Sequence, residues 1–205
     1  MEIWSQFRER VFGSEFDIWH DGGVNYTAAW ALKQENPAHV RAMLLEGLAK
    51  QDYVAILGLQ LVEWSDLVEL LTPCLELSHG TGKFRVELAQ LLQAKAAGQD
   101  LEGGGRDYSQ YVLSELENPS SDLRLYAAVA LRNFPAESVM EGLLRHIAMD
   151  GAFLVRINAF ESVVKLKGQQ ASTMPQYEEW SGMLGDSRGP EDWAKVAEGV
   201  RGFSF

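Results

Sequence analysis

Apolar residues recur along the chain at intervals of three and four, the spacing of one face of an α-helix. The stretch "LRLYAAVAL" (123–131) shows this most clearly, and related stretches are "VNYTAAWAL" (24–32), "YVAILGLQL" (53–61), "FRVELAQLL" (84–92) and "VRINAFESV" (155–163). In all five, the first, fifth and ninth positions are apolar or aromatic and lie four residues apart. The pattern predicts five related helices that begin 29 to 39 residues apart.

A second amphipathic segment follows each of these helices. The five segments cover residues 37–50, 65–78, 107–117, 136–149 and 174–184. Prolines stand near the predicted helix starts and glycines near helix ends, at Pro37, Pro135 and Pro175 and at Gly80, Gly98 and Gly168. The chain is therefore expected to form paired helices.

We predict an all-α protein with a single repeat domain over residues 1–205, built from about five helix pairs. The repeat units lie near residues 23–50, 51–78, 81–117, 120–149 and 151–184, and segments 1–22 and 185–205 are expected to cap the two ends. The glycine-rich stretch "GQDLEGGGRD" (98–107) is interpreted as a surface loop inserted between the two helices of the third unit.

The sixth position of the five aligned stretches is small in four of them, at Ala29, Gly58, Ala89 and Ala128. Small residues there would let neighbouring helices approach closely. The fifth stretch has Phe160 instead, which indicates a looser or terminal unit.

The order of residues in "DLRLYAAVAL", with Asp and Arg before Ala-Ala and Leu, resembles the first helix of HEAT-type (armadillo-type) repeats. The stretches "LVRINAFESV" and "KFRVELAQLL" are similar, and the resemblance covers roughly residues 20–185. It implies a right-handed α-α superhelix of helix pairs, a solenoid that usually serves as a protein-binding scaffold. It implies no chemistry.

Arg85, Arg124 and Arg156 occupy the same position in three of the aligned stretches. We expect each to lay its apolar stem along the core of its helix pair. Its guanidinium would then meet a carboxylate or a free helix-end carbonyl between adjacent units. A residue that recurs at the same repeat position favours this structural role over a binding role.

The formal net charge of −11 argues against binding to nucleic acid or to an anionic membrane, because both need clustered Lys and Arg. A basic protein partner fits better. The start of the chain, "MEIWSQFRERVF", lacks a basic region followed by an apolar stretch, and no apolar run reaches the ~20 residues of a membrane span. We expect a soluble cytoplasmic protein.

No catalytic motif emerges, so neither a cofactor nor a metal is predicted. "HGTGK" (79–83) lacks the first glycine of a phosphate-binding loop, and Phe84 stands where Ser or Thr is required. Cys74 is the single cysteine and is interpreted as a small buried hydrophobe. The histidines are interpreted as surface residues because they lack the spacing of a helical metal site: His20, His39, His79 and His146.

Acidic residues gather on one face of the predicted helix 65–78, where Asp66, Glu69 and Glu76 lie opposite the leucines and Glu63 precedes the helix. The fourth unit contributes Glu137 and Glu141. In the superhelix that the resemblance implies, second helices line the concave surface, so these carboxylates would form an acidic trough with Trp64 as an aromatic anchor. The alternative is an ordinary solvated helix face.

Three hypotheses of function follow. The first is a non-enzymatic module that binds a basic protein through its acidic concave face, such as an inhibitor or an immunity-type protein. The second is a general scaffold that binds partners through hydrophobic grooves, with the negative charge serving solubility. The third is a HEAT-like enzyme, either a lyase acting on bilin chromophores or a repair glycosylase, and the glycosylase would need a basic groove that the net charge disfavours.

Overall fold

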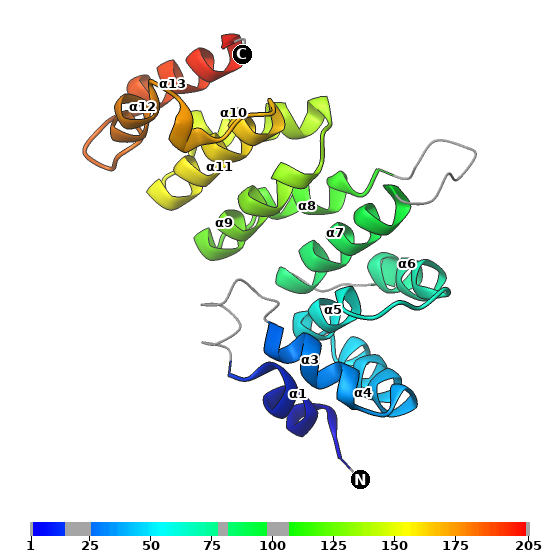
Figure 1. Cartoon of the computed structure of the whole chain (residues 1–205). Coiled ribbons are helices and arrows are strands. Elements are labelled where there is room, and N and C mark those ends of the chain that lie inside the picture. The colour runs from blue at the N-terminus through cyan, green and yellow to red at the C-terminus, as the bar shows by residue number, and fades with distance from the viewer. Residues whose placement is uncertain (1, 15–25, 78–81, 98–106, 204–205) are drawn as a thin grey trace. The chain divides into compact units, whose positions relative to one another are not determined.

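A computed structural model describes residues 2–14, 26–77, 82–97 and 107–203 (Figure 1). These residues form twelve α-helices and two short 3-10 helices, with no strand among them. The predicted all-α class is therefore confirmed for the described residues. Three predicted features lie outside the described residues: residues 15–22 of the amino-terminal cap, Gly80, and residues 98–106 of the glycine-rich stretch.

The chain divides into two compact units, residues 1–106 and 107–205. In unit 1, α1 packs against α3 and α4, α4 packs against α5, and α7 packs against both α5 and α6. The bounds of these helices are α1 (Trp4–Phe12), α3 (Tyr26–Gln34), α4 (Pro37–Ala49), α5 (Tyr53–Gln60), α6 (Leu67–Leu77) and α7 (Lys83–Ala97). Neighbours in sequence are thus neighbours in space.

Unit 2 follows the same principle, since α9 packs against α8 and α11, and α10 packs against α8, α11 and α13. Its helices are α8 (Ser109–Leu116), α9 (Ser121–Ala130), the 3-10 helix η1 (Leu131–Asn133), α10 (Glu137–Met149), α11 (Phe153–Leu166), the 3-10 helix η2 (Ala171–Thr173), α12 (Tyr177–Met183) and α13 (Pro190–Gly202). The pairs α8–α10 and α9–α11 are helices two apart in the chain.

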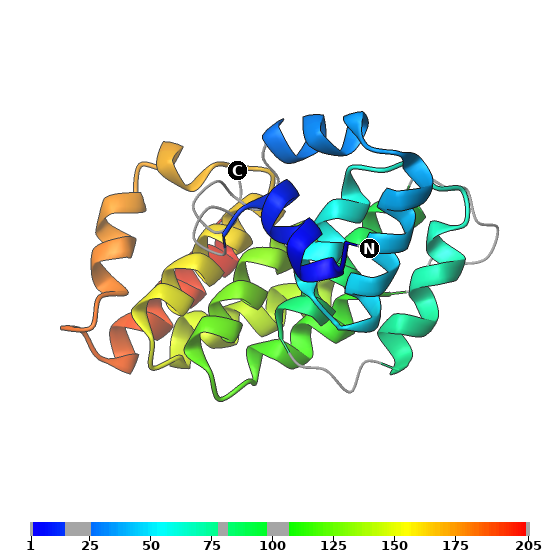
Figure 2. The ribbon, with the colours of Figure 1, turned by 90° about the horizontal axis from the view of Figure 1, so that it is seen from below.

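The end of unit 2 differs from the expected pairing. The segment 174–184 was predicted to be the second helix of the last pair, but only Tyr177–Met183 is helical, and α12 contacts α13 and η2. The carboxy-terminal helix α13, part of the segment expected as a cap, lies along α10 and also contacts α11 (Figure 2). Pro175 and the extended Met174 before α12 shorten that helix.

Close approach of helices at a small residue occurs at Gly58 of α5. A Cβ atom at this position would lie 2.6 Å from Leu44 Cδ2 and 2.8 Å from Phe12 Cζ. Gly58 therefore lets α5 lie against both α4 and α1. In the fifth stretch, Phe160 is buried, and its ring packs against those of Tyr177 and Trp180 on α12.

Candidate functional site

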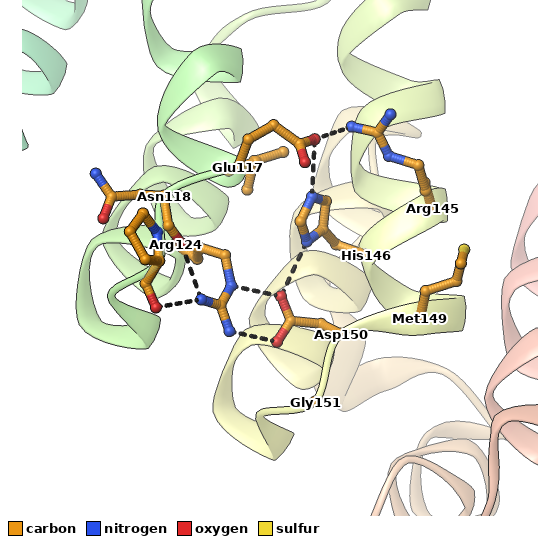
Figure 3. A pocket seen from close by; sticks show the side chains of 10 residues that line it. Glu117, Asn118, Arg124, Arg145, His146, Met149, Asp150 and Gly151 are labelled. Carbon is orange, nitrogen blue, oxygen red and sulfur yellow. Dashed lines mark hydrogen bonds and ion pairs between the residues drawn. The ribbon is translucent and has the colours of Figure 1, made fainter.

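A charged hollow of about 410 Å³ opens on unit 2 beside the loops that join α8 to α9 and α10 to α11 (Figure 3). Five side chains of both charges dominate its polar lining. The apolar, exposed side chain of Met149 lies at its edge. The five are Glu117, Arg124, Arg145, His146 and Asp150.

Arg124 and Asp150 form the base of the hollow. Arg124 Nε donates to Asp150 Oδ2 at 2.8 Å, and Arg124 Nη2 donates to Oδ1 at 3.0 Å. Arg124 Nη1 donates to the carbonyl oxygens of Asn118 and Pro119 at 2.9 and 3.0 Å. The side chains are 18% and 2% exposed, so this two-point ion pair is largely removed from water.

His146 lies between two carboxylates. Its Nδ1 atom is 2.9 Å from Asp150 Oδ2, and its Nε2 atom is 3.5 Å from Glu117 Oε1. Glu117 is also paired with Arg145 at the outer edge of the hollow (Figure 3). The prediction that His146 is a surface residue is wrong, because the ring is buried on α10. The overlooked signal is Asp150 four residues after His146, one helical turn away.

Asp150 stays ionised at neutral pH. Burial alone would raise its pKa, but hydrogen bonds from Arg124, the Ala152 N–H and His146 outweigh burial and bring the pKa down to about 2. Asp150 Oδ1 accepts the Ala152 N–H at 2.9 Å, directly before α11 begins. The carboxylate therefore joins α9, α10 and the start of α11.

The lining of the hollow offers no hydroxyl or thiol nucleophile. None of the residues that line it is Ser, Thr or Cys. The Nε2 atom of His146, the side that would act as a base, faces a carboxylate rather than a nucleophile. Its charged side chains instead hydrogen-bond to one another and to the loops that join α8 to α9 and α10 to α11.

Arg156, one repeat after Arg124, makes a related set of contacts. Its Nη1 donates to the Asp150 carbonyl at 2.7 Å, six residues earlier, as Arg124 Nη1 does to the Asn118 carbonyl. Its Nε donates to the Leu184 carbonyl at 2.9 Å and its Nη2 to Asp186 Oδ1 at 2.7 Å. Both arginines thus meet the carboxylate and helix-end carbonyl partners that the repeat position suggested. Arg85 is half-buried in the first turn of α7.

The acidic residues predicted as a trough fall into two groups. In unit 1, Glu63 is exposed before α6, and Glu69 and Glu76 are exposed on α6, opposite the buried residues Leu67, Leu71 and Leu75. In unit 2, Glu137 is exposed in the first turn of α10, and Glu141 is paired with Arg201 of α13 at 2.9 Å. Glu69 and Glu76 thus lie on α6 with Glu63 just before it, and the other two residues lie on α10.

Two of the predicted binding residues have partners within unit 1. Arg41 of α4 pairs with both carboxylate oxygens of Asp66, with Nη1 to Oδ1 at 3.1 Å. The same guanidinium lies over the Trp64 ring, 4.6 Å from its centroid. Asp66 and Trp64 therefore anchor the segment before α6 to α4.

Further chemistry is sparse in the part of the chain that the structure describes. It holds no cluster of three or more His, Cys, Asp or Glu side chains that would fit a metal ion. Cys74 is half-buried on α6, and burial raises the pKa of its thiol. No described helix is both long enough and apolar enough to cross a membrane.

Comparisons with protein-family models, with curated proteins and with solved structures find no match to this chain. The case for a function therefore depends on the residues and contacts described above.

Proposed function

We propose that the protein is a non-enzymatic module that binds a basic protein partner through the acidic face of α6. The observation that carries the proposal is a set of exposed carboxylates: Glu69 and Glu76, on the side of α6 away from its buried leucines, and Glu63 shortly before the helix. The net charge of −11 adds a long-range attraction for a basic surface. An inhibitor or immunity-type protein, which masks a cationic site on its partner, is the form that we favour.

The helix packing supports a solenoid as the framework for this role. Within unit 1, α5 packs against α7, and within unit 2, α8 packs against α10 and α9 against α11. Contacts between helices two apart are what repeated helix pairs make when they stack. We propose that the whole chain is one HEAT-like array of about five helix pairs, in which α6 is a second helix and faces the concave side.

The pairing of Asp66 and Trp64 with Arg41 narrows the proposed surface. Asp66 is neutralised by Arg41 within unit 1, so the attraction for a basic partner comes from Glu63, Glu69 and Glu76. Trp64 contributes its stacked ring to the rim of this surface.

A capture experiment on three matched proteins tests the proposal. The bait is the wild-type chain, the variant Glu69→Lys with Glu76→Lys, or the control Glu178→Lys with Glu179→Lys. Both double variants change the net charge equally, and all four side chains are exposed. We expect the wild type and the control to retain a basic protein that elutes with rising salt, while the α6 variant loses it. Equal retention by all three baits would rule out the α6 face.

A second candidate is a scaffold that binds partners by apolar contact. Two large apolar side chains are exposed near the loop between α10 and α11: Met149 at 73% and Leu154 at 57%. Exposed apolar surface of this kind is what a partner held by apolar contacts would need. Binding of this kind would resist salt and would be lost in Met149→Ser with Leu154→Ser, whereas the α6 variant would bind normally.

A further inference from the structure

A second cavity of unit 2, with a volume of about 550 Å³, shares no lining residue with the hollow of Figure 3. It forms where the chain passes from α11 to α12. Its walls come from η1, the last turns of α11, the turn that follows, η2 and the start of α12. Arg132 of η1 therefore meets a continuous stretch of chain, residues 161–177, at one concave site.

Gly168 directs the chain over this cavity. Its φ of 81° lies in the left-handed region, and its N–H donates to the Lys165 carbonyl at 2.9 Å, which ends α11. The residues after Gly168 then form one wall, including Gln169 and Ser172. The wall is set by the backbone of this turn rather than by a long loop.

Arg132 of η1 lines the cavity and is incompletely hydrogen-bonded. Its Nε donates to Ser162 Oγ at 3.2 Å, and this hydroxyl donates to the Ala128 carbonyl at 2.8 Å. Its Nη2 atom is buried and has no hydrogen-bond partner in the described residues. A guanidinium carries five N–H donors and no acceptor, so an unsatisfied buried donor on it is costly. Burial lowers the pKa of Arg132, and the charge of the nearby Glu161 carboxylate opposes this shift.

The other charged groups of the cavity leave it with an excess of positive charge. Glu161 of α11 accepts a hydrogen bond from the Tyr177 hydroxyl at 2.9 Å, which raises the pKa of Tyr177. Lys165 lies one turn further along α11 and is exposed at the edge. Two cations and one carboxylate give the lining a formal charge of +1, in a chain whose net charge is −11.

We propose that this cavity binds a small organic carboxylate, with Arg132 donating N–H groups to its oxygens and Lys165 adding attraction at the entrance. A planar carboxylate matches the charge and the planar shape of a guanidinium. Glu161, engaged by the Tyr177 hydroxyl, and the Tyr177 ring, 6.1 Å from the Phe160 ring, also line the cavity. This inference concerns a small molecule and does not depend on the protein-binding role.

The test compares benzoate with benzamide, which has the same shape and no charge. Each is titrated into the full-length 15N-labelled protein, and backbone amide shifts are followed by NMR. We expect saturable shifts for the residues around the cavity, including Lys165, Gln169 and Ser172, and an affinity for benzoate at least about 10-fold higher than for benzamide. Equal affinities, shifts elsewhere in the chain, or no saturable binding would overturn the proposal, since a cavity that holds only water would not distinguish the two.

Two variants test whether Arg132 and Lys165 bind benzoate. Arg132→Gln should weaken benzoate binding about 10-fold or more, and Lys165→Gln should weaken it about two- to threefold. Lys195→Gln removes the same charge from an exposed position on α13 that does not line the cavity and should leave binding unchanged. If Arg132→Gln does not fold, Lys165→Gln and Lys195→Gln decide the matter, and equal benzoate affinity in these two would contradict the proposal.

Discussion

The guanidinium of Arg156 lies over the ring of Trp193, with its central carbon 3.7 Å from the ring centroid. Arg156 has no exposed side-chain surface, and it donates to the carbonyls of Asp150 and Leu184. Hydrogen bonds from this one side chain join α11 to the residue after α10 and to the residue after α12. Its stacking on Trp193 joins α11 to α13.

Replacement of this arginine should destabilise the protein strongly. Arg156→Met keeps most of the side-chain volume but leaves two buried carbonyl groups without a donor, so we expect a loss of about 3 kcal/mol in the free energy of unfolding. Urea unfolding followed by circular dichroism measures this. Arg188→Met is the control, because Arg188 is exposed. Equal midpoints for the two variants would contradict the structural role of Arg156.

The Arg124–Asp150 pair should matter far more than the surface pair beside it. Arg124→Ala leaves a carboxylate that is 2% exposed without its cation, and we expect a cost of about 3 kcal/mol. Arg145→Ala breaks the pair with Glu117, whose side chains are 57% and 60% exposed, and should cost less than about 1 kcal/mol. Thermal unfolding of both variants provides the comparison, and an unchanged melting temperature for Arg124→Ala would be inconsistent with this account.

Because of Asp150, the free energy of unfolding should also fall as the pH is lowered. Its pKa of about 2 in the folded protein lies below the ordinary value, so its stabilisation is complete above about pH 4 and is lost as the pH falls towards 2. A shift of this size corresponds to roughly 2 kcal/mol.

The free energy of unfolding, measured between pH 5 and pH 2, should fall less steeply in Asp150→Asn than in the wild type. Asp122→Asn, at an exposed position on α9, should follow the wild type. Parallel curves for the wild type and Asp150→Asn would show that Asp150 has an ordinary pKa.

Substitution by alanine should change stability in opposite directions at Gly58 and Gly182. Gly58→Ala places a methyl group 2.6 Å from Leu44 Cδ2, so overpacking should outweigh the gain in helix propensity and destabilise the protein by about 1–3 kcal/mol. Gly182→Ala on α12 meets no atom within 4 Å and should stabilise by about 0.5–1 kcal/mol. Stability that rises in both variants would mean that α5 does not pack closely at Gly58.

The helices were accessible from the sequence because each carries a local signal. Apolar spacing, Pro37 at a helix start and the Asn36 cap, which accepts the Ala38 N–H at 2.9 Å, are all short-range features. The common position of Arg124 and Arg156 was also visible as a repeat. The family resemblance remains a prediction.

The pairing of α13 with α10 and the sites of unit 2 were not accessible in this way. The contacts of Arg156 with Leu184 and Asp186 span 28 and 30 residues, and nothing in the local pattern specifies them. The cavity around Arg132 joins five segments, so no single stretch reveals it. His146 was missed because its partners are carboxylates rather than a second histidine.

The central claim is that exposed carboxylates on α6 attract a basic partner, and the affinity for the captured protein as a function of ionic strength tests it most directly. The account predicts that Kd for the wild type rises steeply with salt and that Glu69→Lys with Glu76→Lys weakens binding most at low salt. Glu178→Lys with Glu179→Lys should match the wild type. A Kd that is independent of salt and equal in all three proteins would contradict the claim.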